Sequence, residues 1–300
     1  MEPKFITIDD TRVPVYEQGS GEAVLLLHGY MGSHLSWRHQ FDALARSYRT
    51  VAVDWLGWGD SEKNPTLNYS LESELDRLRR LIGELGLKPL HLVGQDYGGL
   101  LTLAYAQKYP DELLDIIILN SKAHSTFRPL WYALFKSMHL VGRIPGSRWI
   151  YRAMPLAATH RLMTLKEQRL GILPKGVVEQ YCGWMKRADG GEYLAKFFED
   201  YRAEPNEELA NGLSQMTTET LILWGAKDRF LDVKIAHELA SRIPKSELKI
   251  YPDAGHFVQE EAPQDVLRDM LAFLEGKRSR TFEQRPALRA VNGGGRIPGH

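Results

Sequence analysis

A buried strand that turns abruptly into a helix constrains this chain more than any other feature of its sequence. An apolar run at residues 90–93 is followed by Gly94-Gln95-Asp96-Tyr97-Gly98-Gly99, and apolar residues then recur at helical spacing over residues 100–106. Glycines on both sides of Asp96 allow the strand and helix backbones to approach closely, and such a turn strains the residue at its tip. The stretch therefore predicts that Asp96 lies at the tip of a tight strand-to-helix turn.

Apolar runs and helical patterns alternate along most of the chain. Fully apolar runs at residues 23–27 and 116–119 are typical of parallel strands that are buried on both faces. We expect further strands at residues 50–53, 220–224 and 247–251, an antiparallel hairpin at 5–8 and 13–17, and helices at 71–85, 233–241 and 263–274. This alternation predicts an α/β fold with a mostly parallel central sheet and helices on both faces.

The alternation stops between residues 122 and 216. This segment contains prolines between short helical patterns and many bulky apolar residues, but it has no strand of the buried type. We expect a helical cap, or lid, domain here, inserted into a core made of residues 1–121 and 217–276. Residues 277–300 hold six basic residues and one acid, which predicts a flexible C-terminal tail.

Composition excludes several classes of protein. Lys and Arg total 38, as do Asp and Glu, so no net field favours nucleic acid or an anionic membrane. The single cysteine, Cys182, rules out an internal disulfide and a cysteine metal cluster. The apolar runs are shorter than a membrane span, and the first residues lack the pattern of a secretory signal. A cytoplasmic protein with no membrane span and no nucleic-acid partner is expected.

A carboxylate at the tip of such a turn has a distinct chemistry. It is ionised at neutral pH, so it can attack a carbon that bears a leaving group without help from a base, and an ester results. Hydrolysis of that ester needs a histidine to deprotonate water and a second carboxylate to orient the histidine. Asp228 and His256 each follow a predicted strand, where catalytic groups of open α/β sheets gather. The order Asp96, Asp228, His256 fits a nucleophile, an acid and a base.

Hydrolysis of an ester also needs an oxyanion hole. Water forms a tetrahedral anion when it attacks the ester carbonyl, and backbone N–H groups can stabilise that anion. The N–H of Tyr97, directly after Asp96, and the N–H of Tyr30, directly after His28-Gly29, are placed to do so. We therefore expect Tyr30 and Tyr97 to form the oxyanion hole.

With these motifs the chain resembles the α/β-hydrolase superfamily over residues 5–274. The resemblance is carried by His28-Gly29, the glycine-punctuated turn at residues 54–61, the turn at Asp96, and Asp228 and His256. An aspartate at this turn is similar to that of epoxide hydrolases and of haloalkane or haloacetate dehalogenases. The resemblance implies the two-step ester mechanism on a small apolar substrate, with water as co-reactant and neither a metal nor an organic cofactor.

The cap residues bear on the choice between these two reactions. Dehalogenases usually carry a tryptophan after the nucleophile to hold the halide, and Tyr97 stands there instead. Halide stabilisation would then come from another tryptophan, for which the candidates are Trp37, Trp131, Trp149 and Trp184. In epoxide hydrolases cap tyrosines protonate the opening ring, and Tyr201-Arg202 resembles the late-cap pair of that family.

Tyr201 is therefore the favoured proton donor, and epoxide hydrolysis is placed slightly ahead of dehalogenation. A non-catalytic binding protein of the same fold, and a decarboxylase or lactone-opening enzyme that uses the same aspartate, stay open as alternatives. The substrate, its stereochemistry and the oligomeric state are left undetermined by the sequence.

Overall fold

One mixed sheet of eight strands forms the centre of the molecule. The computed structural model describes residues 2–123, 125 and 127–284, with side chains through residue 276. The strands are β1 (Lys4–Ile8), β2 (Thr11–Gln18), β3 (Ala23–Leu27), β4 (Arg49–Val53), β5 (Leu90–Gln95), β6 (Leu113–Leu119), β7 (Thr220–Gly225) and β8 (Ser246–Tyr251). Their order across the sheet is β1-β2-β4-β3-β5-β6-β7-β8, and only the β1–β2 and β2–β4 pairs are antiparallel. The predicted α/β fold is confirmed.

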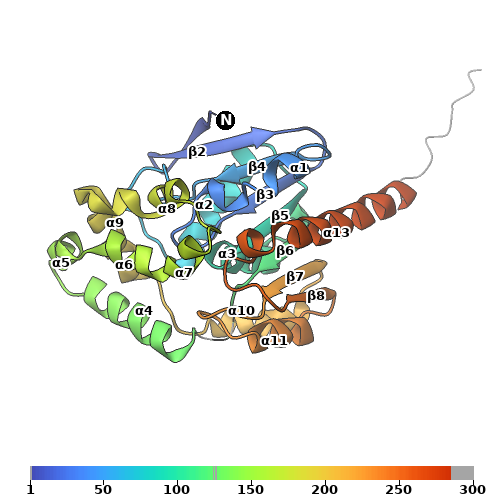
Figure 1. Ribbon diagram of the computed structural model, residues 1–300. Coiled ribbons are helices and arrows are strands. Elements are labelled where there is room, and N and C mark those ends of the chain that lie inside the picture. Colours follow the sequence, from blue (N-terminus) through green and yellow to red (C-terminus); the bar gives the residue numbers. More distant parts are fainter. Residues whose placement is uncertain (1, 124, 126, 285–300) are drawn as a thin grey trace, which may run out of the picture.

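Helices cover both faces of this sheet (Figure 1). Apolar residues of α1 (Phe41–Leu44) and α13 (Pro263–Gln284) pack with one face of the strands. Those of α2 (Leu71–Glu84), α3 (Tyr97–Lys108) and α11 (Lys234–Arg242) pack with the other. All five residues of β3 are buried, as expected of a central parallel strand that contacts helices on both sides.

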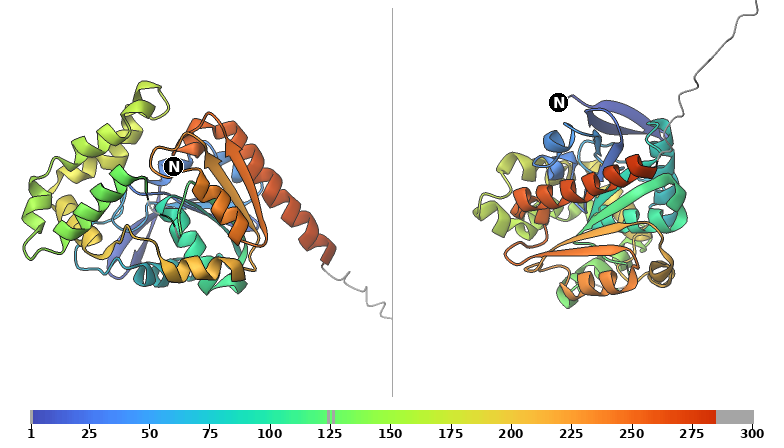
Figure 2. Two further views of the ribbon diagram at one scale, coloured as in Figure 1. Left: turned by 90° about the horizontal axis from the view of Figure 1, so that it is seen from below. Right: turned by 90° about the vertical axis from the view of Figure 1, so that its right-hand side faces the viewer.

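The described part of the chain between β6 and β7 consists of helices joined by loops and turns and contains no strand. It contains α4 (Pro129–Gly142), α5 (Arg148–Ala153), α6 (Leu156–Met163), α7 (Leu165–Arg169), α8 (Lys175–Cys182), α9 (Ala188–Asp200) and α10 (Glu207–Gly212), with short 3-10 turns at Gly183–Lys186 and Leu213–Gln215. We call residues 129–215 the helical insertion. Helices α4 to α9 gather to one side of the sheet, green to yellow in Figures 1 and 2.

The last helix is longer than the sequence pattern predicts. The helix expected at residues 263–274 continues to Gln284, so the first part of the tail predicted at residues 277–300 is helical, and residues 285–300 lie outside the described part of the chain. Figure 2 shows α13 extending past the edge of the sheet. Although α13 has 22 residues, neither it nor any other described helix combines the length and apolarity of a membrane span.

The turn from β5 into α3 has the predicted tight geometry. Asp96 adopts φ 49° and ψ −110°, a left-handed backbone conformation that is strained for a residue with a side chain. A Cβ atom on Gly94 would lie 2.2 Å from the carbonyl oxygen of Gly98, and one on Gly98 would lie 2.4 Å from the carbonyl oxygen of Leu27. These glycines therefore permit β3, β5 and α3 to lie close enough to position Asp96.

We expect Gly94→Ala to lower the free energy of unfolding by about 1–3 kcal/mol, because the new methyl group overlaps backbone atoms that have no room to move. Urea denaturation followed by circular dichroism measures this change. The matched control is Gly83→Ala in α2, where a Cβ atom meets nothing within 4 Å. The control should unfold at the same urea concentration as the wild type or a slightly higher one. Equal midpoints for the two variants would contradict the proposed role of Gly94.

Candidate active site

Three side chains converge at the carboxyl ends of three strands. Asp96 follows β5, Asp228 follows β7 and His256 follows β8. The imidazole Nδ1 of His256 lies 2.8 Å from Asp228 Oδ2, and its Nε2 lies 3.9 Å from Asp96 Oδ1. The structure thus brings together the three residues that the sequence analysis grouped, with the imidazole between two carboxylates.

Asp228 is held firmly by its surroundings. It is 2% exposed, and its Oδ1 accepts the backbone N–H groups of Phe230, at 2.7 Å, and Leu231, at 3.0 Å. Its Oδ2 accepts a hydrogen bond of 2.7 Å from the side-chain amide of Asn120 and also faces His256. These hydrogen bonds hold the carboxyl group of Asp228 in one orientation, and that orientation fixes the imidazole ring.

The Asp96 carboxylate occupies the predicted oxyanion hole. The backbone N–H of Tyr30 donates to its Oδ2 at 3.0 Å, and the N–H of Tyr97 also donates to the carboxylate. The carbonyl oxygen of Asp96 accepts hydrogen bonds from Ser121 Oγ, at 2.6 Å, and from the N–H of Leu100, at 3.0 Å. Oδ2 is therefore anchored by the N–H of Tyr30, while Oδ1 is directed toward His256.

Burial and mutual attraction act in opposite directions on the charges of this pair. Burial raises the pKa of Asp96, and the positive charge of His256 and the two N–H donors oppose that rise. Burial alone would lower the pKa of His256, but the charge and hydrogen bond of Asp228, together with the charge of Asp96, raise it to about 9. A pKa of about 9 favours the imidazolium form of His256 at neutral pH, and this ring lies between the side chains of Asp96 and Asp228.

A small apolar chamber surrounds the reactive face of Asp96. Its volume is about 20 Å³, roughly the space of one water molecule. It is lined by Tyr30, Met31, Asp96, Phe127, Phe135, Met163, Phe230, His256 and Phe257. We call this space the inner chamber. Because its walls are mainly aromatic and methionine side chains, rotation of these side chains is needed before a substrate can enter.

A much larger cleft lies next to Tyr97. Its volume is about 920 Å³, and its lining includes Tyr97, Lys122 and Tyr201. We call this space the outer cleft. The ring of Tyr201 lies 5.9 Å from that of Tyr97 and stacks on Phe197 at 5.2 Å. Tyr201, which the sequence analysis favoured as proton donor, thus stands at the wall between the outer cleft and the buried carboxylate, whose charge helps burial raise its pKa.

The four candidate tryptophans are not gathered at one place. Trp131 packs on Phe230 with ring centroids 4.6 Å apart, and Phe230 lines the inner chamber. Trp184 is buried, and its indole N–H donates to the carbonyl of Tyr181 at 3.0 Å. Trp37 is fully buried with α1 and α13 on the face of the sheet away from the chamber, and Trp149 is 68% exposed on α5. Neither Trp37 nor Trp149 therefore lines the inner chamber.

Further residues that support the site were missed by the sequence analysis. Tyr97 donates its hydroxyl to the buried carboxylate of Glu74 at 3.2 Å. The Tyr30 hydroxyl lies 2.8 Å from His160 Nε2 on α6, and His160 Nδ1 faces the carbonyl of Leu156 at 2.6 Å. Nδ1 must carry the proton to bond that carbonyl, so Nε2 accepts from Tyr30. Burial lowers the pKa of His160 to about 4, which keeps this link to the helical insertion neutral.

Asn120 is also a missed residue, and the sequence contains a signal for it. It follows the apolar β6 directly, at the edge of the sheet where functional polar groups gather. Besides donating to Asp228, it accepts the N–H of Gly225 through its side-chain oxygen at 3.1 Å. It therefore connects the ends of β6 and β7. No comparable signal marks Glu74 or His160, because their partners are distant in the chain.

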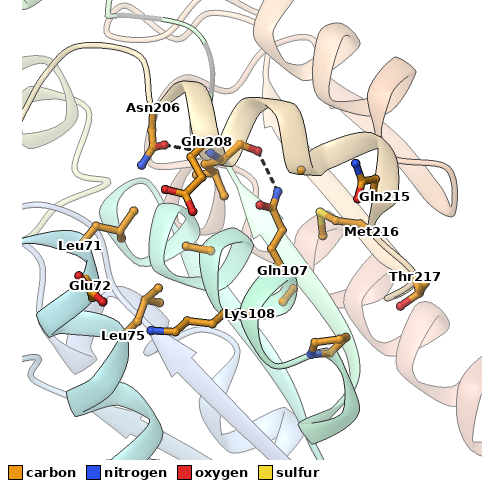
Figure 3. A pocket seen from close by; sticks show the side chains of 15 residues that line it. Leu71, Glu72, Leu75, Gln107, Lys108, Asn206, Glu208, Gln215, Met216 and Thr217 are labelled. Carbon is orange, nitrogen blue, oxygen red and sulfur yellow. Dashed lines mark hydrogen bonds between the residues drawn. The ribbon is translucent and has the colours of Figure 1, made fainter.

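A second groove on the surface is lined by none of the candidate residues. A groove of about 660 Å³ lies between α2, α3 and α10, where Gln107 donates to the carbonyl of Leu209 at 2.8 Å (Figure 3). Leu71 and Asn206 line both this groove and the outer cleft, so the two adjoin. Among the described residues, no group of three or more His, Cys, Asp or Glu side chains is arranged to hold a metal ion.

Comparison with known proteins gives a consistent picture of the fold. Residues 22–263 match the family model described as alpha/beta hydrolase fold. The chain is 28% identical to epoxide hydrolase 3 of Xenopus tropicalis, over 90% of this chain and 77% of that protein. It is 25% identical to lipase 3 of Moraxella sp. (strain TA144), over 92% of this chain and 85% of that protein. A solved epoxide hydrolase from Bacillus megaterium superposes with a TM-score of 0.74 at 21% identity, covering 91% of this chain and all of the other (100%).

Asp228→Asn should lower the pKa of His256 below about 9, because the substitution removes the negative charge that favours the imidazolium. The pH titration of the imidazole ¹⁵N signals measures it, with the His256 signals identified by their loss in His256→Gln. Asp253→Asn is the matched control, since Asp253 lies exposed in the same loop as His256 and pairs with Lys227. A wild-type His256 that titrates near the ordinary value of about 6.5 would contradict the electrostatic picture.

Proposed function

This chain belongs to the α/β-hydrolase family and is an enzyme, and on that premise we propose that it hydrolyses epoxides through an ester formed on Asp96. The observation that carries the proposal is that the two oxygens of one buried carboxylate, that of Asp96, have different partners. Oδ2 accepts the N–H of Tyr30 at 3.0 Å, and Oδ1 faces His256 Nε2 at 3.9 Å. An oxygen free of strong donors is the better nucleophile, and the anchored oxygen becomes the ester carbonyl.

In the first step Asp96 Oδ1 attacks an epoxide carbon. The new bond joins Oδ1 to that carbon, the carbon–oxygen bond of the ring breaks, and the ring oxygen takes a proton from a nearby acid. Tyr201 is the proposed acid, since it lies in the wall of the site close enough for the charge of Asp96 to raise its pKa. The product of this step is a hydroxyalkyl ester of Asp96.

In the second step water attacks the ester carbonyl carbon. His256 Nε2 accepts a proton from the water, and the anion that forms on Oδ2 is stabilised by the N–H groups of Tyr30 and Tyr97. Each such donor is typically worth about 2.7–4 kcal/mol of barrier. Collapse of the anion breaks the bond between the carbonyl carbon and the substrate oxygen. That oxygen takes the remaining proton of the attacking water, so a diol is released and the carboxylate is restored. The proton that the imidazolium loses before this step restores Tyr201, and the net reaction adds one water to one epoxide.

Esterification also prepares His256 for its role as a base. In the resting site the charge of Asp96 contributes to the raised pKa of His256. The ester is neutral, so this contribution disappears in the intermediate and the pKa of His256 falls. The imidazole then loses its proton more readily at the moment when the reaction needs a base, while Asp228 continues to hold the ring in place.

The surroundings favour an epoxide over a haloalkane. A departing halide needs N–H donors, but Trp184 donates to a backbone carbonyl. Trp131 packs on the chamber residue Phe230 without lining the chamber itself, and Trp37 and Trp149 do not line it either. Two tyrosines instead stand at the wall of the site, Tyr97 and Tyr201. The relationship to a curated epoxide hydrolase supports the same choice, although lipases are related at similar identity.

A paired screen of epoxides and haloalkanes of matched size tests this function. Diol formation from epoxides without halide release from haloalkanes is the expected result. Halide release without diol formation would identify a dehalogenase with the same nucleophile. Absence of both reactions, with the fold shown intact by circular dichroism, would favour a binding protein or another hydrolytic reaction.

His256→Gln should make the ester accumulate, because glutamine cannot accept the proton of the attacking water. Steady-state turnover should fall about 10²–10⁴-fold. Intact-mass spectrometry after mixing with an epoxide that the wild type hydrolyses should show the protein heavier by one substrate. Adding Asp96→Ala should abolish the adduct. If His256→Gln forms no adduct, the two-step mechanism is contradicted.

Tyr201→Phe should slow epoxide opening by about 10²-fold, since the departing oxygen loses its acid. Burst kinetics that separate ester formation from hydrolysis should place the loss in the first step. The control is Tyr132→Phe on α4, whose hydroxyl accepts a hydrogen bond from Lys136. An unchanged rate of ester formation in Tyr201→Phe would exclude Tyr201 as the donor and leave the nucleophile assignment intact.

A further inference from the structure

A buried lysine at the wall of the outer cleft has no part in the chemistry described above. Lys122 comes directly after Ser121, whose hydroxyl binds the carbonyl of Asp96. It is 5% exposed, and its ammonium donates to the carbonyl of Ala203 at 3.2 Å. The same ammonium lies 5.1 Å from the ring centre of Phe127, which lines the inner chamber. Lys122 therefore stands where the outer cleft meets the reactive site.

Burying an ammonium ion is costly unless it is paired. Burial lowers the pKa of Lys122 to about 8, and the charges of Asp96 and Glu204 oppose this fall. No carboxylate among the described residues comes within 4.0 Å of its nitrogen. In the described part of the chain its one hydrogen bond is to a backbone carbonyl. An ammonium carries three donors. The buried charge thus retains capacity for an acceptor supplied from the cleft.

We propose that Lys122 binds a carboxylate of the substrate, so that an epoxide acid places its anionic end in the outer cleft and its ring in the inner chamber. This inference rests on the proposed function and names the class of its substrate. The cleft is wide enough for such a group, at about 920 Å³, whereas the chamber at Asp96 is small and apolar. Charge recognition would therefore occur outside the chamber and chemistry within it.

The other charges of the cleft favour a monoanion. Arg143 and Arg202 also line it and add positive charge, while the acids that line it are Glu199, Asp200, Glu204 and Glu207. Three of these acids already have basic partners, because Lys196 pairs with Glu199 and Asp200, and Lys136 lies 3.6 Å from Glu204. Four carboxylates in one cleft nevertheless disfavour a multiply charged group such as a phosphate, and a single carboxylate fits the balance better.

The test compares an epoxide acid with the primary amide of the same carbon skeleton. The wild type should prefer the acid by at least about tenfold in kcat/KM, as expected for a charged hydrogen bond that the amide cannot make. Lys122→Met should remove this preference by raising KM for the acid, and should change the amide by less than about threefold. Lys122→Arg, which keeps the charge, should retain part of the preference.

Lys175→Met is the matched control, since it removes a positive charge from an exposed side chain of α8 that does not line the outer cleft. It should leave the preference for the acid unchanged. Equal losses for acid and amide in Lys122→Met would show that Lys122 serves only to balance the charge of Asp96, and would overturn the proposal. A wild-type preference for the amide would also overturn it, even if Lys122→Met does not fold.

A binding measurement separates this inference from the proposed reaction. Calorimetric titration with cyclopropanecarboxylate, and with cyclopropanecarboxamide as the neutral probe, needs no turnover. Binding of the acid that is lost in Lys122→Met would support the carboxylate site even if no epoxide is hydrolysed. Turnover of neutral epoxides together with no binding of the acid would retain the proposed function and reject the role of Lys122.

Discussion

The attraction between the Asp96 carboxylate and the imidazole of His256 is the interaction on which the rest of the site depends. A carboxylate in an apolar chamber loses several kcal/mol of hydration, which is why burial raises its pKa. Two backbone N–H groups and a positively charged neighbour offset this cost. Asp228 holds the imidazole of His256 in place and favours its protonated form. A reactive anion can therefore exist in a space from which water is nearly excluded. An electrophilic carbon in that space competes with little water for contact with the anion.

Contacts between the core and the helical insertion serve this arrangement. Tyr30 uses its N–H to bind Asp96 and its hydroxyl to bind His160 of α6, so one residue joins the reactive carboxylate to the insertion. Tyr97 donates its hydroxyl to the carboxylate of Glu74, and its ring packs against that of Tyr201. The two residues proposed to form the oxyanion hole are thus held in position by contacts with both the core and the insertion. Displacement of the insertion would move the groups that line the inner chamber.

The sequence predicted the parts of the site that depend on local pattern. Asp96, Asp228 and His256 each follow an apolar strand, and the carboxyl ends of parallel strands meet at one edge of the sheet. The tight turn followed from glycines whose absence of a Cβ atom is required for close approach. The α/β fold followed from the alternation of buried strands and amphipathic helices. In each case the prediction depends on the sequence of the element itself and of the residues next to it.

Features that depend on distant contacts were not predictable in this way. Trp37 and Trp149 look alike in sequence, yet one lies in the core under α13 and the other is exposed on α5. Glu74, His160 and Lys122 gain their meaning from partners on other elements. Helix α13 continues to Gln284 because residues 275–284, although mostly polar, contain only one glycine and no proline. Charge alone does not end a helix.

The chain is related to both epoxide hydrolases and lipases, so membership of the family does not by itself identify the nucleophile of the covalent step. The most direct measurement is a single turnover of an epoxide by excess enzyme in H₂¹⁸O, followed by mass spectrometry of the peptide that contains Asp96. The proposed mechanism predicts that ¹⁸O enters the Asp96 carboxylate and that the diol released in this first turnover carries none. Labelled diol with an unlabelled Asp96 peptide would show that water attacks the epoxide directly, and would contradict the role of Asp96 as nucleophile.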